Sequence, residues 1–174
     1  ITQTDILNIK SSLENQYIQC FSSYIFNDNV TSGTGCKLRT YRKYKCEYKM
    51  ENYLQNVTNF KYRKALAKLR LSNHKLYIEK GRYTKVPVNE RLCSLCGEIE
   101  DEFHFVVKCE LYKNLRLKIY DDIDKYIENF NILSDAAKFK IFMSPKGANV
   151  TVLVSKFIYE CFELRIANAM SSVN

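Results

Sequence analysis

Hydrophobic side chains recur at helical spacing along most of this 174-residue chain. In residues 5–26 they follow one another at steps of three and four, which predicts an amphipathic helix with Thr4 as its N-cap. The same pattern predicts helices over the ranges 37–57, 59–71, 110–127, 134–144 and 149–170. In the first of these, the side chains expected on the inner face are Leu38, Tyr41, Tyr44, Tyr48 and Leu54. Residues 72–92 lack this periodicity and contain Gly81 and Pro87, so we expect an irregular connector there.

Four potential metal ligands lie close together in the sequence after this connector. The motif Cys93-Ser94-Leu95-Cys96-Gly97 is followed by His104 and Cys109, which gives the spacing C-x2-C-x7-H-x4-C. Three thiolates and one imidazole complete a tetrahedral shell, the closed arrangement of a structural zinc site. The sequence therefore predicts Zn2+ bound by Cys93, Cys96, His104 and Cys109, with a short helix carrying His104 toward Cys109.

The remaining histidine and cysteines do not extend this cluster. A deaminase-type catalytic zinc would place a glutamate two residues after the histidine, but Val106 occupies that position. His74 has no second ligand nearby and is interpreted as a surface or hydrogen-bonded histidine. Four scattered cysteines are interpreted as small buried apolar side chains: Cys20, Cys36, Cys46 and Cys161. Unpaired thiols beside a thiolate metal site suit a reducing compartment, so we expect an intracellular location, nuclear or cytoplasmic.

The fold class that we predict is mainly α, with bundle-like helical segments and a small irregular zinc knuckle between two helical halves. The composition, 46% hydrophobic and 26% charged, is that of a globular chain, and no apolar run could span a bilayer. The chain starts without methionine, and we expect it to be a piece of a longer protein. We divide it into an N-terminal helix and loop (1–35), a basic helical region and connector (36–85), the zinc knuckle (86–112) and C-terminal helices (113–174).

Positive charge is concentrated in the segment before the knuckle. Residues 36–85 carry fifteen basic and three acidic residues, a net charge of +12, whereas the whole chain carries +8. Such a segment is typical of proteins that bind nucleic-acid phosphates. The alternative is a solvated helix surface whose tyrosines face inward, which the helical spacing of Tyr41, Tyr44 and Tyr48 favours. The candidate phosphate contacts are Arg39, Arg42, Lys43, Lys61, Arg63, Lys64, Lys68 and Arg70.

Two short strings resemble fragments of enzyme active sites but lack their context. Tyr120-Asp121-Asp122 has the aspartate pair of polymerases, but the surrounding pattern predicts a helix instead of a hairpin. Glu47-Tyr48-Lys49 matches part of a nuclease motif, with no carboxylate-bearing strand in reach. Paired carboxylates must converge in space to hold catalytic metal ions, so we predict no catalytic residue.

The chain resembles the C-terminal region of LINE-type, non-LTR retrotransposon polyproteins, and in particular their reverse-transcriptase zinc-binding domain. The ligand motif carries the resemblance together with flanking strings: Tyr62-Arg63, Leu69-Arg70-Leu71-Ser72 with His74, Ile78-Glu79-Lys80-Gly81-Arg82-Tyr83, Glu90-Arg91-Leu92-Cys93, Glu100-Asp101-Glu102-Phe103-His104-Phe105 and Lys156-Phe157-Ile158-Tyr159-Glu160. It covers most of the chain and is strongest over residues 60–112.

This resemblance implies an accessory region that follows the polymerase domain of a reverse transcriptase. The expected partners are template RNA or target DNA and the upstream polymerase domain, with no membrane. Two other functions stay open. The chain could be a zinc-stabilised protein–protein interaction module that meets an acidic partner, or a nuclease or other enzyme.

Overall fold

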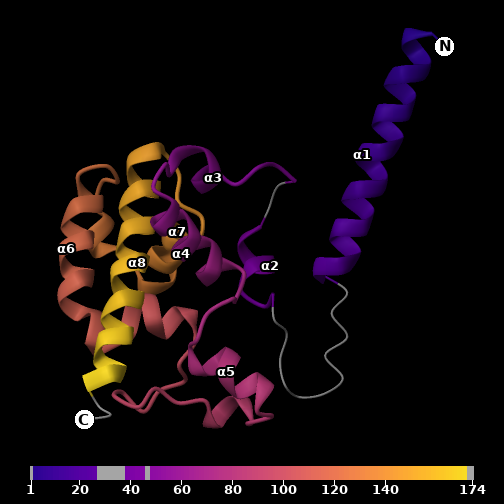
Figure 1. Ribbon diagram of the computed structural model, residues 1–174. Helices are drawn as coiled ribbons and strands as arrows, with labels where there is room; N and C mark the ends of the chain where they lie inside the picture. The colour runs from indigo at the N-terminus through magenta and orange to yellow at the C-terminus, as the bar shows by residue number, and fades with distance from the viewer. Residues whose placement is uncertain (1, 27–37, 46–47, 172–174) are drawn as a thin grey trace.

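The computed structural model describes residues 2–26, 38–45 and 48–171, and these residues form helices and no β-strand (Figure 1). This confirms the predicted mainly α fold, with the Cys/His cluster between two helical halves. The α-helices are α1 (Gln3–Phe26), α2 (Tyr41–Tyr44), α3 (Asn52–Asn56), α4 (Phe60–Arg70), α5 (Tyr77–Tyr83), α6 (Lys113–Asp124), α7 (Asp135–Met143) and α8 (Ala148–Ser171). Shorter turns are η1 (Val88–Glu90), η2 (His104–Lys108), η3 (Glu110–Tyr112) and η4 (Phe130–Ile132).

Helix α8 is the centre of the fold. It contacts α3, α4 and α6, and Figure 1 shows α6 and α8 side by side. Val154, Phe157, Ile158 and Cys161 recur at steps of three and four and are at most 2% exposed. The predicted helix over 149–170 is therefore confirmed, and so is the interpretation of Cys161 as a buried apolar side chain.

Helices α4 and α7 were also predicted correctly, because both carry local start signals. The Asn59 side chain accepts hydrogen bonds from the backbone N–H groups of Lys61 and Tyr62, at 2.9 and 3.4 Å. Ser134 accepts one from Ala137 N at 3.3 Å. Past the knuckle, the helix predicted over 110–127 is present as η3 followed by α6.

The single helix predicted over 37–57 is wrong, because this segment forms the two short helices α2 and α3. Tyr41 of α2 and Tyr53 of α3 lie on the same buried cation, with the Arg70 guanidinium carbon 5.7 and 5.6 Å from their ring centroids. Two of the residues predicted on the inner face, Tyr48 and Leu54, are exposed. Tyr53, which was not predicted on that face, is buried.

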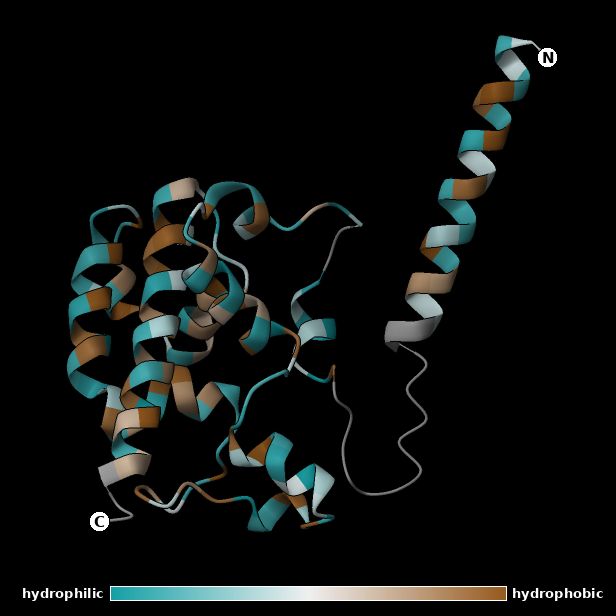
Figure 2. Cartoon of the chain, viewed as in Figure 1, coloured by the Kyte–Doolittle hydropathy of each residue, from teal (hydrophilic) through white to brown (hydrophobic). Residues whose placement is uncertain are grey.

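Helix α1 is confirmed, but its cap and its environment differ from the prediction. Thr2, and not Thr4, caps the helix: its hydroxyl accepts from Asp5 N at 3.2 Å, and its backbone N–H donates to the Asp5 carboxylate at 2.7 Å. The apolar side chains along α1 are 58–63% exposed: Ile6, Leu7, Ile9, Leu13 and Tyr17. Figure 2 shows hydrophobic bands along α1, which stands apart from the other helices. Its contacts are near its C-terminal end, where Phe21 packs edge-on against Tyr48 with ring centroids 5.3 Å apart.

Two other predictions are corrected. Cys20 is exposed and is not a buried apolar side chain, while Cys36 and Cys46 lie outside the described residues. The connector 72–92 is partly helical, since it contains α5 and η1. As for membranes, none of the helices in the described ranges combines the length and the apolar character needed to cross a bilayer.

Gly81 in α5 allows a buried arginine to pack against the helix. Arg91 is 1% exposed, and its guanidinium donates to Ile78 O at 2.7 Å and to Val86 O at 2.9 Å. A Cβ on Gly81 would lie 2.7 Å from Arg91 Cγ and 2.8 Å from Cδ, well inside van der Waals contact. The absence of a side chain at residue 81 is therefore required by the path of Arg91.

Gly81→Ala is expected to lower the free energy of unfolding by about 1–3 kcal/mol, because Arg91 must leave its two carbonyl acceptors or push α5 away. Urea denaturation monitored by helical circular dichroism measures this change. Lys80→Ala, at an exposed position of the same helix, is the control and should stay within about 0.5 kcal/mol of the parent chain. An unchanged midpoint for Gly81→Ala would show that the Arg91 side chain moves without cost.

Candidate metal centre

Cys93 and Cys96 lie on a tight turn closed by backbone hydrogen bonds. Cys93 N donates to Glu98 O at 2.7 Å, and Gly97 N donates back to Cys93 O at 2.9 Å. Gly97 has a φ of 69°, a left-handed conformation that glycine adopts without a Cβ clash. An isolated antiparallel bridge between Leu92 and Ile99 joins the two arms of the turn. The backbone therefore points both cysteines into one loop.

The other two ligands come from the ends of the π-helical turn η2. The Asp101 carboxylate accepts from His104 N at 2.8 Å and starts this turn. Cys109 N donates to His104 O at 2.8 Å, the i to i+5 hydrogen bond of a π-helix. His104 and Cys109 are five residues apart, so this bond holds them one above the other. The predicted short helix is confirmed, and its π form brings both side chains toward the loop.

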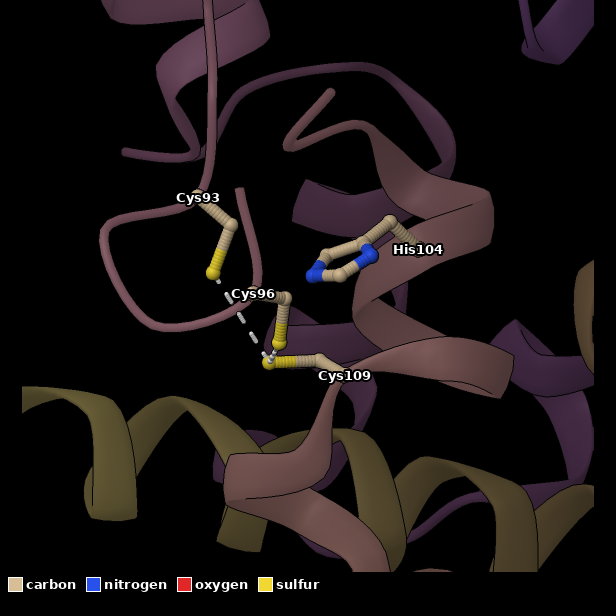
Figure 3. A group of neighbouring side chains, drawn as sticks. All are labelled: Cys93, Cys96, His104 and Cys109. Atoms are coloured by element: carbon tan, nitrogen blue, oxygen red, sulfur yellow. Dashed lines mark hydrogen bonds between the residues drawn. The ribbon is translucent and has the colours of Figure 1, made fainter. Parts of the chain in front are cut away.

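The four ligand atoms form one compact group. They all lie within 4.8 Å of one another, and Cys109 Sγ is 4.0 Å from Cys93 Sγ and 3.8 Å from Cys96 Sγ. Figure 3 shows one ring nitrogen of His104 facing the three sulfur atoms. A tetrahedral centre with metal–sulfur bonds of about 2.3 Å has sulfur–sulfur edges of about 3.8 Å. The spacing matches such a centre and is far too long for a disulfide, which needs about 2.05 Å.

The protonation chemistry of the cluster also suits a bound cation. Burial, together with the neighbouring Cys93 and Cys96 thiols, raises the pKa of Cys109 to about 12, so a metal ion would be needed to hold the thiolate form. His104 Nε2 is buried and has no hydrogen-bond partner among the described residues, while Nδ1 lies 3.2 Å from the Glu98 carboxylate. A metal-binding histidine shows this arrangement, with its second nitrogen held by a carboxylate. Cys93, Cys96, His104 and Cys109 can therefore hold a metal ion and leave no open position on it.

Glu100, inside the knuckle, connects the centre to two helices. Its carboxylate accepts from Tyr77 N at 2.6 Å, at the start of α5, and from Arg165 of α8, with Nη2 at 3.0 Å. Its backbone carbonyl accepts from Ile78 N at 3.1 Å. The loop that holds the ligands thus also ties α5 to α8.

Glu102 gathers a second set of contacts beside the centre. It is 1% exposed and accepts from Arg39 Nη2 at 2.7 Å, Thr40 Oγ1 at 3.0 Å, Ser72 Oγ at 3.0 Å and His74 Nε2 at 2.9 Å. Burial alone would raise its pKa, but the hydrogen bond from His74 and the positive charge of Arg39 outweigh burial and lower the pKa to about 2. His74 is therefore the hydrogen-bonded histidine that was predicted, and not a metal ligand.

Two of the eight cations predicted to contact phosphates are held inside the fold. Arg39 pairs with the buried carboxylates of Glu79 and Glu102, and its Nη2 lies 2.7 Å from Glu102 Oε1. Arg70 is 3% exposed, pairs with Glu51 at 2.8 Å and donates to Met143 O. The prediction of a phosphate contact does not suit Arg39 or Arg70, because each would have to give up the ion pairs that it makes within the fold.

The other six predicted cations are at or near the surface. Lys43, Lys61, Lys64 and Lys68 are exposed. Arg42 and Arg63 are half-buried, and Arg63 donates to Val57 O at 3.1 Å. The tyrosines of this region, Tyr41, Tyr44 and Tyr62, pack on or near the core, which confirms that they face inward. Tyr48 is the exception, since it is exposed.

Of the enzyme-like strings, Asp121 and Asp122 lie on α6, so the predicted helical setting is confirmed. Asp122 pairs with Lys125 at 2.7 Å. Glu47 lies outside the described residues.

Sequence reasoning missed Glu102 and Phe60. Glu102 belongs to the acidic run Glu100-Asp101-Glu102 inside the ligand loop, a signal that could have marked it as an internal ion-pair partner. Phe60 is 63% exposed at the start of α4, and no feature of the helical pattern distinguishes it from a core residue.

No protein-family model, curated protein or solved structure matches this chain.

Proposed function

We propose that this chain is a zinc-stabilised, non-catalytic accessory region of a non-LTR retrotransposon reverse transcriptase, and that it binds RNA or DNA through phosphate contacts. The observation that carries the proposal is the cluster of Cys93, Cys96, His104 and Cys109. These four residues also carry the resemblance to the reverse-transcriptase zinc-binding domain. Upstream in the same polyprotein, the polymerase domain would be its neighbour.

Zinc is the metal that best fits this donor set. Three sulfur ligands and one imidazole nitrogen in a tetrahedral arrangement are typical of structural zinc, and carboxylate-preferring ions such as Mg2+ and Ca2+ are disfavoured. The metal would stabilise the knuckle, and the knuckle holds α5, α8 and the Glu102 contacts in place. In this proposal zinc stabilises the fold and does not touch the nucleic acid.

The proposed phosphate contacts are Lys61, Lys64 and Lys68 on α4, with Lys43 on α2. The three α4 lysines are exposed, and within the described part of the chain none of them has a carboxylate partner. Uncompensated ammonium groups on one helix edge favour a polyanion, because phosphate binding releases condensed counterions. Lys61, Lys64 and Lys68 are therefore the residues to test.

Changing all three α4 lysines to glutamine is expected to weaken binding to a single-stranded RNA and to make its salt dependence shallower. Loss of three phosphate contacts reduces the slope of log affinity against log salt by about two. Fluorescence anisotropy across a salt series measures both quantities. The matched control is a triple glutamine variant of three exposed lysines, Lys113 and Lys118 on α6 and Lys125 just after it, which should bind like the parent chain. A flat salt response of the parent chain would contradict nucleic-acid binding.

A protein–protein interaction module is the second candidate function, and α1 favours it. Ile6, Ile9 and Leu13 are 58–61% exposed along one side of this helix. An apolar side of this length is typical of a helix that packs against another protein surface. A flat salt response in the assay above would leave this function as the conclusion.

A further inference from the structure

Phe60 is an exposed aromatic residue flanked by cations. It is the first residue of α4 and is 63% exposed. Lys64 Nζ lies 5.5 Å from its ring centroid, and Arg63 Cζ lies 5.9 Å from it. Both distances fall within the range of cation–π contacts. Phe60 thus differs from Tyr41 and Tyr53 of the same basic region, whose rings are buried in the fold.

Helical geometry places Phe60 on the same face as the exposed lysines of α4. At about 100° per residue, Phe60, Lys61, Lys64 and Lys68 fall within one side of the helix, opposite the buried Leu66 and Leu69. Lys61 and Lys68 are separated by about 10 Å along the axis. An aromatic ring and a row of ammonium groups are therefore presented together.

We propose that Phe60 stacks against an unpaired base, and that the preferred ligand of this face is a single-stranded nucleic acid. The inference rests on the proposed function and names its substrate class. A base has a π-face that stacks on an aromatic ring, while Lys61, Lys64 and Lys68 contact the phosphates on either side. In a duplex the bases are already stacked on one another, so only the phosphate contacts remain. An acidic protein would meet the same lysines, but it has no base to stack on the ring.

The test uses the 174-residue chain with fluorescent single-stranded RNA and DNA and a duplex of the same sequence. Phe60→Ala is expected to weaken single-strand binding about 10-fold, within the range for loss of one stacked base, and to change duplex binding less than about 2-fold. The salt slope of Phe60→Ala should equal that of the parent chain, since no charge is lost. Zinc content and helical circular dichroism, expected to be unchanged, verify that the variant is folded.

Three controls isolate the stacking contact. Phe60→Tyr keeps an aromatic ring and should bind like the parent chain, whereas Phe60→Leu keeps only apolar area and should bind like Phe60→Ala. Tyr126 is a second exposed aromatic residue, 55% exposed, on the segment after α6 and distant from Phe60 in the sequence. Tyr126→Ala should have no effect on single-strand binding. A single strand with abasic sites should bind the parent chain and Phe60→Ala equally.

The outcomes separate this inference from the proposed function. If the triple lysine variant weakens binding but Phe60→Ala does not, or if Phe60→Leu binds like the parent chain, the stacking proposal is overturned and nucleic-acid binding stands. An equal loss for single strand and duplex also overturns it. If the parent chain binds neither ligand, both proposals fail.

Discussion

Cys109→Ser is expected to abolish stoichiometric zinc binding and to lower the free energy of unfolding by at least about 3 kcal/mol. Cys109 is 3% exposed and its sulfur contacts both other sulfurs of the cluster, so the change removes one of the four donor atoms of the group. Structural zinc supplies a large part of the stability of small zinc domains. The loss of about 3 kcal/mol corresponds to a fall in melting temperature of about 6–12 °C for a chain of this size.

The experiment compares zinc content by elemental analysis with thermal unfolding by circular dichroism. Cys161→Ala is the matched control, because Cys161 is a fully buried cysteine on α8 outside the ligand group. It should retain one zinc per chain, and any loss of stability should come only from the smaller side chain. A chelator should reproduce the effect of Cys109→Ser on the parent chain and have little further effect on the variant. One equivalent of zinc in Cys109→Ser would show that the ligand set is wrong.

Glu102→Gln is expected to destabilise the fold by about 3 kcal/mol at neutral pH. The change removes the negative charge of the carboxylate that pairs with Arg39 and accepts a hydrogen bond from His74. Removal of one partner of a buried ion pair typically costs about 3–5 kcal/mol. Glutamine keeps the volume of the side chain and one carbonyl acceptor, so the loss reports mainly on charge. Glu110→Gln is the control: the Glu110 side chain is 69% exposed, and its pair with Lys113 should contribute less than about 0.5 kcal/mol.

The pH dependence of this loss has a defined sign. The pKa of Glu102 is lowered from 4.5 to about 2 on folding, so its stabilising contribution is fully present above pH 4.5 and is lost as the pH falls through 2. A lowered pKa of this size corresponds to about 3 kcal/mol. The difference in unfolding free energy between the parent chain and Glu102→Gln should therefore shrink between pH 5 and pH 2. Urea denaturation at several pH values measures it, and a constant difference would contradict the ionised state of Glu102.

The elements that sequence reasoning predicted well are those with local signals. The side chains of Asn59 and Ser134 cap the helices that they begin, and the apolar spacing of α8 continues without interruption. The range 37–57 was predicted wrongly, because Tyr41, Tyr44 and Tyr48 keep helical spacing although Tyr41 packs together with Tyr53 on Arg70, a cation from a later helix. Helical periodicity does not distinguish a continuous helix from two short ones whose rings share a distant partner.

By itself, the sequence determined the mainly α composition and the four Cys/His residues of the candidate metal centre, since capping, periodicity and ligand spacing are properties of neighbouring residues. Only the tertiary structure decided what the cations do. Arg39 pairs with Glu79 and Glu102, which lie 40 and 63 residues later in the sequence, and Arg70 pairs with Glu51, which lies 19 residues earlier. Lys61, Lys64 and Lys68 remain exposed. Whether a charged side chain reaches solvent or a buried partner depends on segments that folding brings together, and such pairings are not encoded in local spacing.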